Sequence, residues 1–201
     1  MDESKNIPVL ECVVGLALLL ALSACRYTGE HDGAARSSGQ SGRHGHVTGQ
    51  LFPVDRYVRA VTDSVMTIRR DGLAVIMVLG REGCYPGQGY QMQRLDTLFR
   101  RQGGRIPMVG LYIDDVQPHV VSSRAAALRL RKVGRATFDV GYSTDPDLIA
   151  FMQGWSYPAI FVLKDHRILA GLWPRRTRSA SGEDPFVRLS HLLGVHGASA
   201  P

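Results

Sequence analysis

Apolar runs separated by polar turns indicate alternating strands and helices along most of the chain. The first clear run, residues 73–79 (Leu-Ala-Val-Ile-Met-Val-Leu), is apolar at every position. A strand with one face in water would alternate apolar and polar residues, so this run predicts a strand buried on both faces in the middle of a sheet. Similar runs at 106–113, 159–163 and 168–172 predict further strands, the last two joined as an antiparallel hairpin.

Helices are predicted where apolar residues recur every three or four positions. One such series places five apolar side chains on a single helical face: Val54, Val58, Val61, Val65 and Ile68. A second helix, from about residue 90 to 102, ends at Gly103-Gly104. Together with the strands at 73–79 and 106–113 it forms a β–α–β unit, whose two strands are expected to run parallel.

Local signals place the remaining elements. They are a helix at 125–133, a short strand near 137–140, a helix that starts at Pro146 and stops at Gly154, and a closing helix at 185–193. Asp145 is the expected cap of the helix that starts at Pro146, because a short polar side chain followed by proline is typical of a helix start. The length of 201 residues suits one domain.

The beginning of the chain has the pattern of a secretion signal. Residues 13–22 are apolar throughout, about the length of a signal-peptide core and too short to cross a bilayer. The next residues, Leu22-Ser23-Ala24-Cys25, resemble the bacterial lipobox, which implies that Cys25 carries lipid on its sulfur and becomes the N-terminus after cleavage. The acidic Asp2 and Glu3 depart from the usual basic leader, and a plain secretory signal or an uncleaved anchor is the alternative.

These features divide the chain into a lipoprotein signal peptide at 1–24, a flexible tether at 25–50 and a folded domain at 51–197. The tether is rich in Gly, Ser, His and Arg and has no apolar period. Its histidines form a short tract with some potential to bind metal: His31, His44 and His46. Two histidines that flank one glycine are more typical of plain linker, so no metal site and no cofactor is expected.

The charge of the chain is moderately basic, at +6. Removal of 1–24 would take away one lysine and three acidic residues and raise the net charge to +8. Arginine clusters at 124–135 and 175–178 indicate either an ordinary solvated face or a surface attracted to anionic lipid or envelope polymers. No nucleic-acid motif accompanies them, so the expected contact is with a membrane through the lipid anchor, and nucleic-acid binding is not expected.

Cysteine usage singles out Cys84. Cys12 would leave with the signal peptide and Cys25 would carry lipid, so Cys84 remains as the one thiol of the mature chain and an intramolecular disulfide is excluded. Cys84 lies between the strand at 73–79 and a helical pattern. The first turn of a helix has N–H groups without helical partners and a partial positive charge, which favour the thiolate over the thiol.

The order of these elements resembles thioredoxin-fold proteins of the bacterial envelope, the TlpA-like/AhpC-TSA branch that includes thiol–disulfide oxidoreductases. The resemblance covers about residues 54–195. Cys84 and Pro86 match the first and third positions of the family's Cys-x-x-Cys motif. The stretch 154–158, Gly-Trp-Ser-Tyr-Pro, is similar to the Gly-x-x-Pro-Thr segment that precedes a hairpin, and the helix at 125–133 is similar to the insertion of this branch.

The resemblance implies an α/β, thioredoxin-like three-layer fold with a central mixed sheet and helices on both faces. It also implies a cis peptide bond before Pro158, which would leave the backbone of Tyr157 facing the thiol and able to bind an extended substrate. An ordinary trans proline at the start of a strand is the alternative. Cys84 and Pro86 are therefore the catalytic candidates, and Tyr157 and Pro158 the substrate-binding candidates.

Three positions depart from the family pattern. Gly87 stands in place of the second, resolving cysteine, Gly83 in place of a tryptophan, and Val78 in place of a buried acid. An ordinary dithiol cycle, in which the second thiol releases the mixed disulfide, is therefore not expected. Copper delivery would need a second cysteine and a nearby histidine, which the motif lacks.

Three hypotheses for the function remain. The first is monothiol exchange with protein or small-molecule thiols and disulfides, in which an external thiol resolves the mixed disulfide. The second is a redox-inactive binding module that uses the surface around Tyr157 and Pro158. A thiol peroxidase ranks third, because the stretch before Cys84, with Gly80 and Gly83, lacks the Pro and Thr of the peroxidase pattern.

Overall fold

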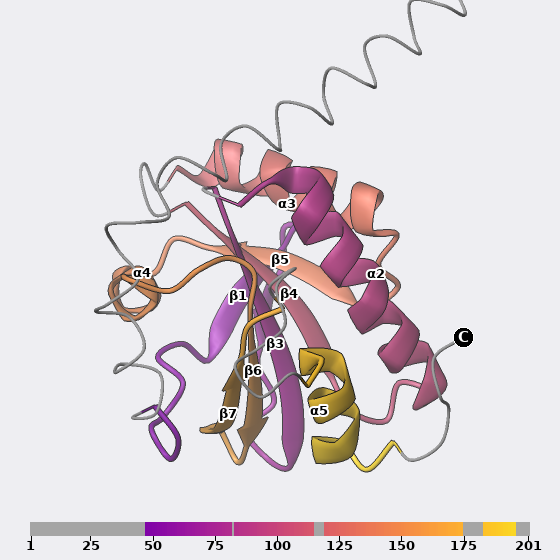
Figure 1. The fold of residues 1–201 in the computed structure, drawn as a ribbon. Coiled ribbons are helices and arrows are strands. Elements are labelled where there is room, and N and C mark those ends of the chain that lie inside the picture. The colour runs from indigo at the N-terminus through magenta and orange to yellow at the C-terminus, as the bar shows by residue number, and fades with distance from the viewer. Residues whose placement is uncertain (1–46, 82, 115–118, 175–182, 196–201) are drawn as a thin grey trace, which may run out of the picture. The chain divides into compact units, whose positions relative to one another are not determined.

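A seven-stranded mixed sheet forms the centre of the computed structural model, which describes residues 47–81, 83–114, 119–174 and 183–195. The sheet has the strand order β2-β1-β5-β4-β3-β6-β7 (Figure 1). Its strands are β1 (Arg56–Arg59), β2 (Val65–Thr67), β3 (Leu73–Gly80), β4 (Met108–Ile113), β5 (Asp139–Ser143), β6 (Ala159–Lys164) and β7 (Arg167–Leu172). The helices are α2 (Tyr85–Arg101), α3 (Val120–Gly134), α4 (Pro146–Met152) and α5 (Pro185–Leu192).

Strand β3 occupies the middle of the sheet, as its uniformly apolar sequence predicts. It pairs in parallel with β4 on one side and antiparallel with β6 on the other. From Ala74 to Gly80 every residue is buried. The prediction of a β–α–β unit with parallel strands is confirmed, because α2 connects β3 to β4. The carboxyl end of β3 leads directly to Cys84.

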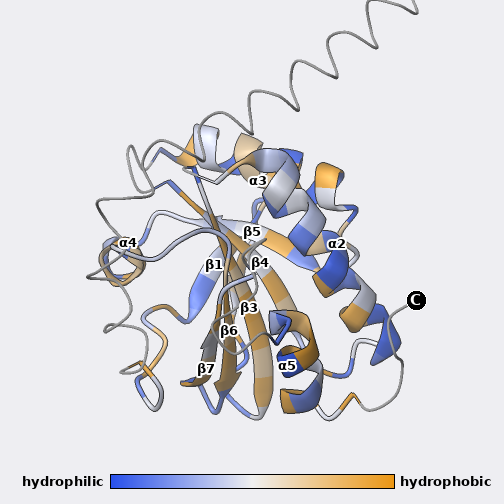
Figure 2. Ribbon diagram, viewed as in Figure 1, coloured by the Kyte–Doolittle hydropathy of each residue, from blue (hydrophilic) through white to orange (hydrophobic). Residues whose placement is uncertain are grey.

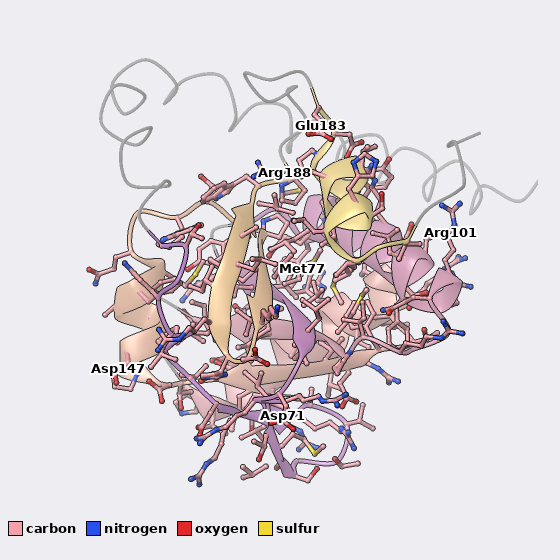
Figure 3. The ribbon with its side chains drawn as sticks, turned by 90° about the horizontal axis from the view of Figure 1, so that it is seen from below. Asp71, Met77, Arg101, Asp147, Glu183 and Arg188 are labelled. Carbon is pink, nitrogen blue, oxygen red and sulfur yellow. The ribbon has the colours of Figure 1, made fainter. Side chains whose placement is uncertain are left out.

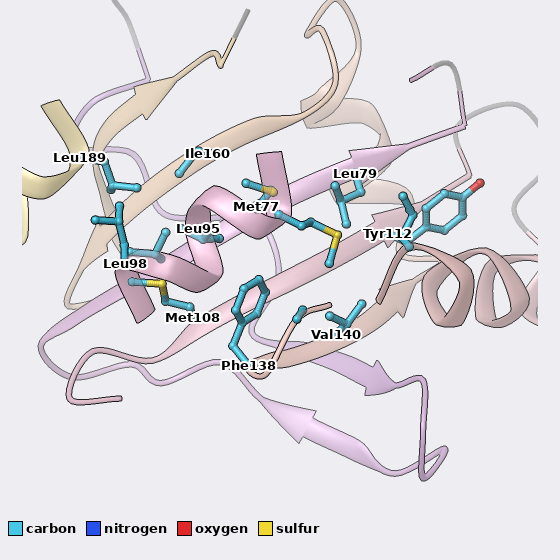
Figure 4. Packing of buried hydrophobic residues seen from close by; sticks show 14 of the residues in the cluster. Met77, Leu79, Leu95, Leu98, Met108, Tyr112, Phe138, Val140, Ile160 and Leu189 are labelled. Atoms are coloured by element: carbon cyan, nitrogen blue, oxygen red, sulfur yellow. The ribbon is translucent and has the colours of Figure 1, made fainter. Parts of the chain in front are cut away.

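Helices cover both faces of the sheet, so the three-layer α/β architecture is confirmed (Figures 1 and 2). On one face α2, α3 and α5 pack over a core that includes Met77, Leu79, Leu95 and Leu130, part of which is seen in Figure 4. On the other face the core contains α4 and the segment that precedes β1. Charged side chains such as Asp71 and Arg101 project from the periphery, whereas Met77 lies inside (Figure 3).

The helix predicted over residues 54–68 is wrong: this segment is an antiparallel hairpin of β1 and β2. A shared helical face would bury its valines together, yet Val61 and Val65 are 48% and 66% exposed. Asp63 adopts a left-handed φ of 57° in the turn. Valine suits strands well, and the pairing of β1 with β5, from 80 residues further along the chain, stabilises the extended form. Long-range pairing has therefore overridden the local spacing.

Most other elements agree with prediction and differ at their ends. The α2 helix starts at Tyr85, α3 starts at Val120, and β5 lies two to three residues beyond the predicted 137–140. The predicted cap is confirmed, since the Asp145 carboxylate accepts a hydrogen bond from the Asp147 N–H at 2.8 Å. The β6–β7 hairpin and α5 are also confirmed.

The N-terminal predictions fall outside the described residues. These are the signal peptide, the lipid-bearing Cys25 and the histidine tract. Residues 47–50, predicted from sequence as the end of the tether, bond to β7: the Gly49 N–H donates to the Ile168 carbonyl at 2.7 Å. Within the described part of the chain, no helix combines the length and apolar character that a membrane span requires.

Candidate functional site

Cys84 is the residue that caps the start of α2, four positions after β3 ends. It is exposed, and among the described residues it is the one cysteine and is not in a disulfide. Its carbonyl oxygen accepts the first helical hydrogen bond, from the Gln88 N–H at 2.9 Å. Pro86 lies in the first turn, where a proline loses no helical hydrogen bond. The fold therefore presents the Cys84 thiol at a helix N-terminus, at the carboxyl end of a buried strand.

Gly87 lies one helical turn from Cys84 and leaves space beside it. A Cβ built on Gly87 would lie 3.9 Å from the Cys84 Cβ and would meet no other atom within 4 Å. Cysteines in a disulfide have Cβ atoms about 3.8 Å apart. The position thus has the geometry of a second cysteine, while the sequence supplies no sulfur there. Within the described part of the chain, no second cysteine lies beside Cys84.

Gln88 bonds to the turn that precedes Cys84, and sequence reasoning missed it. Its side chain is buried, with 1% exposure. The Gly80 N–H donates to Gln88 Oε1 at 3.0 Å, and Gln88 Nε2 donates to the carbonyl oxygens of Gly80 and Gly83, both at 2.9 Å. The one available signal was a glutamine four residues after Cys84, hence on the same helical side. Nothing local indicated that it is buried.

Tyr157 and Pro158 lie next to the end of β3. The peptide bond between them is cis. Ala159, the next residue, pairs with Val78, so this loop and the turn before Cys84 belong to the same end of the sheet. The Tyr157 ring packs so closely on Gly80 that a Cβ there would lie 2.5 Å from it. The two halves of the predicted site are thus brought together by the pairing of β3 with β6.

Two tryptophans beside the cis peptide bond form a stacked pair that was not predicted. The centroids of the Trp155 and Trp173 rings lie 4.4 Å apart, and the angle between the two ring planes is 20°. Trp155 precedes Tyr157 by two residues, and Trp173 directly follows β7, whose Leu172 pairs with Ile160 of β6. Both side chains are half-buried. The two tryptophans belong to different segments of the sequence, so no local pattern predicts that they stack.

On the α3 side, Tyr85 is the first helical residue after Cys84. The guanidinium carbon of Arg129 lies 5.0 Å from the centre of the Tyr85 ring.

Burial raises the pKa of the Tyr112 hydroxyl, and nearby Tyr85 and Asp114 raise it further. Tyr112 therefore stays neutral at physiological pH. Arg81 lies 3.8 Å from the carboxylate of the buried Asp114.

The interior below the site is apolar. Val78 has no exposed surface and belongs to the core cluster that contains Ile76, Leu111 and Ala159. In the described residues, no group of three or more His, Cys, Asp or Glu side chains has an arrangement that would hold a metal ion. The chemistry that these residues can carry is that of the exposed Cys84 thiol. The backbone of the Tyr157–Pro158 loop and the aromatic surface of the two tryptophans offer places where a substrate could bind.

Comparison with known proteins bears on the fold. Neither a protein-family model nor a curated protein sequence matches the chain. Solved structures do, among them a hypothetical protein from Sinorhizobium meliloti, with TM-score 0.54 and 12% identity over 74% of this chain and 81% of that one. The C-terminal domain of a protein assigned as a thiol–disulfide oxidoreductase from Bacteroides thetaiotaomicron has TM-score 0.52 and 11% identity over 74% and 97%.

A secreted Mycobacterium tuberculosis disulfide oxidoreductase, described as homologous to E. coli DsbE, has TM-score 0.50 and 9% identity over 70% of this chain and 95% of that one. Identities this low establish the fold and leave the activity open. The protein has a thioredoxin-like fold, of the kind found in DsbE-like thiol–disulfide oxidoreductases.

Proposed function

We propose that this protein carries out thiol–disulfide exchange through Cys84 as a single thiol. The observation that supports this most is the exposed Cys84 at the start of α2, with the Tyr157–Pro158 loop at the same end of the sheet. Gly87 leaves the position of a second thiol open. Structural neighbours that are oxidoreductases of the same fold are consistent with this chemistry.

The proposed reaction has two steps. The Cys84 thiolate attacks one sulfur of a substrate disulfide, so that a bond forms between Cys84 and that sulfur and the other substrate sulfur leaves as a thiolate, which takes up a proton. An external thiolate then attacks the substrate sulfur of the mixed disulfide and releases the Cys84 thiolate. The external thiol is oxidised to a disulfide with the substrate half, so Cys84 returns unchanged.

Substrate contact is proposed at Tyr157 and Pro158. An extended peptide next to Cys84 would bond to backbone groups of this loop. The Trp155–Trp173 pair adjoins the loop and adds a broad apolar surface on which a side chain of the peptide can pack. Partners of this chemistry are protein or small-molecule thiols and disulfides.

A redox-inactive binding module is the second candidate. It is favoured by Gly87 and Val78, because both stand where a resembling oxidoreductase has a group that releases the mixed disulfide. In this case Tyr157, Pro158 and the stacked tryptophans would bind an extended segment of a partner without covalent chemistry. A thiol peroxidase ranks behind both.

Mixed-disulfide formation distinguishes the candidates. The domain from residue 47 onward, incubated with oxidised glutathione, is expected to gain one glutathione per molecule, which intact-mass spectrometry detects and added reduced glutathione reverses. Cys84→Ser removes the attacking sulfur and is expected to abolish the adduct. A wild-type domain that forms no adduct over a range of pH, while it still binds extended peptides, would favour the binding module.

We also propose that the mature protein lies in the cell envelope, where lipid on Cys25 anchors it to a membrane and the folded domain faces the periplasm or the cell exterior. The lipobox-like sequence supports this location, as does the secreted M. tuberculosis neighbour. A stable membrane anchor usually needs two contributions, such as two acyl chains or one acyl chain and a basic patch. Lipid on Cys25 and the net positive charge of the protein would supply them.

Fatty-acid labelling tests this anchor. The wild-type protein, expressed in a bacterial host, is expected to incorporate labelled fatty acid and to fractionate with membranes. Cys25→Ala is expected to lose the label and to appear in the soluble envelope fraction. A wild-type protein that stays in the membrane without label would indicate an uncleaved anchor, and a soluble wild-type protein would indicate a plain secretory signal. Either result would contradict lipidation.

A further inference from the structure

The buried side chain of Gln88 is hydrogen-bonded to the turn between β3 and Cys84. Three hydrogen bonds of 2.9 to 3.0 Å join its carboxamide to Gly80 and Gly83. Among the described residues, a backbone bond also crosses this turn and is longer, from the Gly83 N–H to the Gly80 carbonyl at 3.2 Å. The carboxamide therefore contributes three shorter hydrogen bonds to the turn.

Both ends of the turn are glycines because another side chain occupies the space of a Cβ. A Cβ on Gly83 would lie 2.4 Å from Gln88 Nε2, and one on Gly80 would lie 2.5 Å from the Tyr157 ring. Gly80 thus contacts Tyr157 at its Cα and Gln88 at its N–H and carbonyl. A continuous set of contacts runs from the Tyr157 loop through Gly80 and Gln88 to Gly83, the residue before Cys84.

We propose that Gln88 is a positioning residue, whose carboxamide sets the place of the Cys84 sulfur relative to the substrate loop at Tyr157 and Pro158. This role rests on the proposed function of Cys84 in thiol–disulfide exchange. The three hydrogen bonds of the Gln88 carboxamide join it to backbone groups of Gly80 and Gly83. It acts through the backbone of Gly80 and Gly83.

The chemistry makes such positioning matter. Exchange requires the attacking sulfur to approach along the axis of the substrate disulfide while the peptide is bound to the loop. Misplacement of a reacting group by about 1 Å can lower a rate by about a hundredfold. A small alkylating reagent needs only an accessible thiolate and no alignment with the loop, so it provides the comparison.

A matched control lies one turn further along α2. Gln91 is also buried, with 6% exposure, and its Nε2 donates to the Pro174 carbonyl at 3.2 Å, whereas the Gln88 carboxamide bonds to Gly80 and Gly83. Gln88→Ala and Gln91→Ala each remove one buried carboxamide from the same helix. Both are expected to lower the resistance of the domain to urea. Only Gln88→Ala is expected to alter how Cys84 reacts.

The measurement is a ratio of two second-order rate constants of Cys84, with oxidised glutathione and with iodoacetamide. Gln88→Ala is expected to lower this ratio about tenfold or more, whereas Gln91→Ala leaves it within about twofold. Gln88→Glu retains the acceptor for the Gly80 N–H, loses both donated bonds when ionised, and is expected to lower the ratio as well. It replaces Gln88→Ala if that variant fails to fold.

A double-mutant cycle adds a readout that a loss of stability does not produce. Gly83→Ala places a methyl group at the carboxamide and is expected to lower the ratio as Gln88→Ala does. In a Gln88→Ala background the same change meets no carboxamide, so it is expected to add little.

The outcomes separate this proposal from the proposed function. If wild-type Cys84 reacts with iodoacetamide but forms no mixed disulfide, the proposed function fails, and a positioning role in that reaction fails with it. If the wild type forms the mixed disulfide and Gln88→Ala has the same ratio as Gln91→Ala, the positioning role alone is overturned. Additive effects of Gly83→Ala and Gln88→Ala would also overturn it.

Discussion

Gly87→Cys is expected to form a disulfide with Cys84 and to convert the protein from a monothiol to a dithiol. The Cβ atoms would lie 3.9 Å apart, within the range of 3.5 to 4.5 Å that is typical of disulfides. Among the described residues, no side chain other than that of Cys84 lies within 4 Å of the new Cβ, so the position has room for it. The new thiolate can attack Cys84 in a mixed disulfide from within the same molecule, which replaces the external thiol.

Intact mass and a thiol count measure this conversion. After mild oxidation the variant is expected to lose two hydrogen atoms and to show no reactive thiol in the described domain. The reduced variant is also expected to release both halves of a disulfide substrate as thiols without added thiol, while its own two thiols are oxidised to a disulfide. The wild type does not do this. Gly87→Ser is the control of similar size. Two thiols that remain after oxidation, or disulfide-linked dimers, would contradict the geometry.

Val78→Asp is expected to destabilise the domain strongly and in a pH-dependent way. Val78 has no exposed surface and lies in the central strand, between Leu111 of β4 and Ala159 of β6. A carboxylate in this apolar cluster loses its hydration without gaining a charged partner, so burial raises the pKa of the new side chain above about 3.9. Resembling oxidoreductases bury an acid at this position, whereas the present core is apolar around it.

The sign of the pH dependence follows from this raised pKa. Below about pH 3.9 the acid is protonated in both the folded and the unfolded protein, so ionisation contributes no cost. Between the unfolded and the folded pKa, stability falls by about 1.4 kcal/mol per pH unit. A cost of about 3 kcal/mol or more is therefore expected by pH 7.

Urea unfolding of Val78→Asp and Val78→Asn at a series of pH values tests this. The asparagine variant has nearly the same shape and no charge, so the difference between the two curves isolates the ionisation. The difference is expected to grow as the pH rises from 4 to 7. A difference in stability that does not change with pH would show that the interior below Cys84 accommodates a carboxylate. The presence of valine in place of an acid at position 78 would then not bear on the mechanism of thiol–disulfide exchange.

Local features of the sequence determined several parts of this structure. The uniformly apolar 73–79 is the central strand β3, Asp145 caps α4, and Cys84 lies between a strand and a helix. Each of these depends on burial or on hydrogen bonds within a few residues, for which local pattern is informative. The match to a thioredoxin-like order of elements added the cis peptide bond before Pro158.

Tertiary structure alone decided the rest. The valine spacing at 54–68 suited a helix, and pairing of β1 with the distant β5 made it a hairpin. The stacking of Trp155 on Trp173 and the packing of Tyr157 on Gly80 join segments far apart in the chain. The sequence did not indicate that Gln88 is buried, because glutamine is usually exposed and its three hydrogen bonds involve backbone groups of a turn. The sequence therefore determined where the thiol lies along the chain, and contacts between distant segments decided what surrounds it.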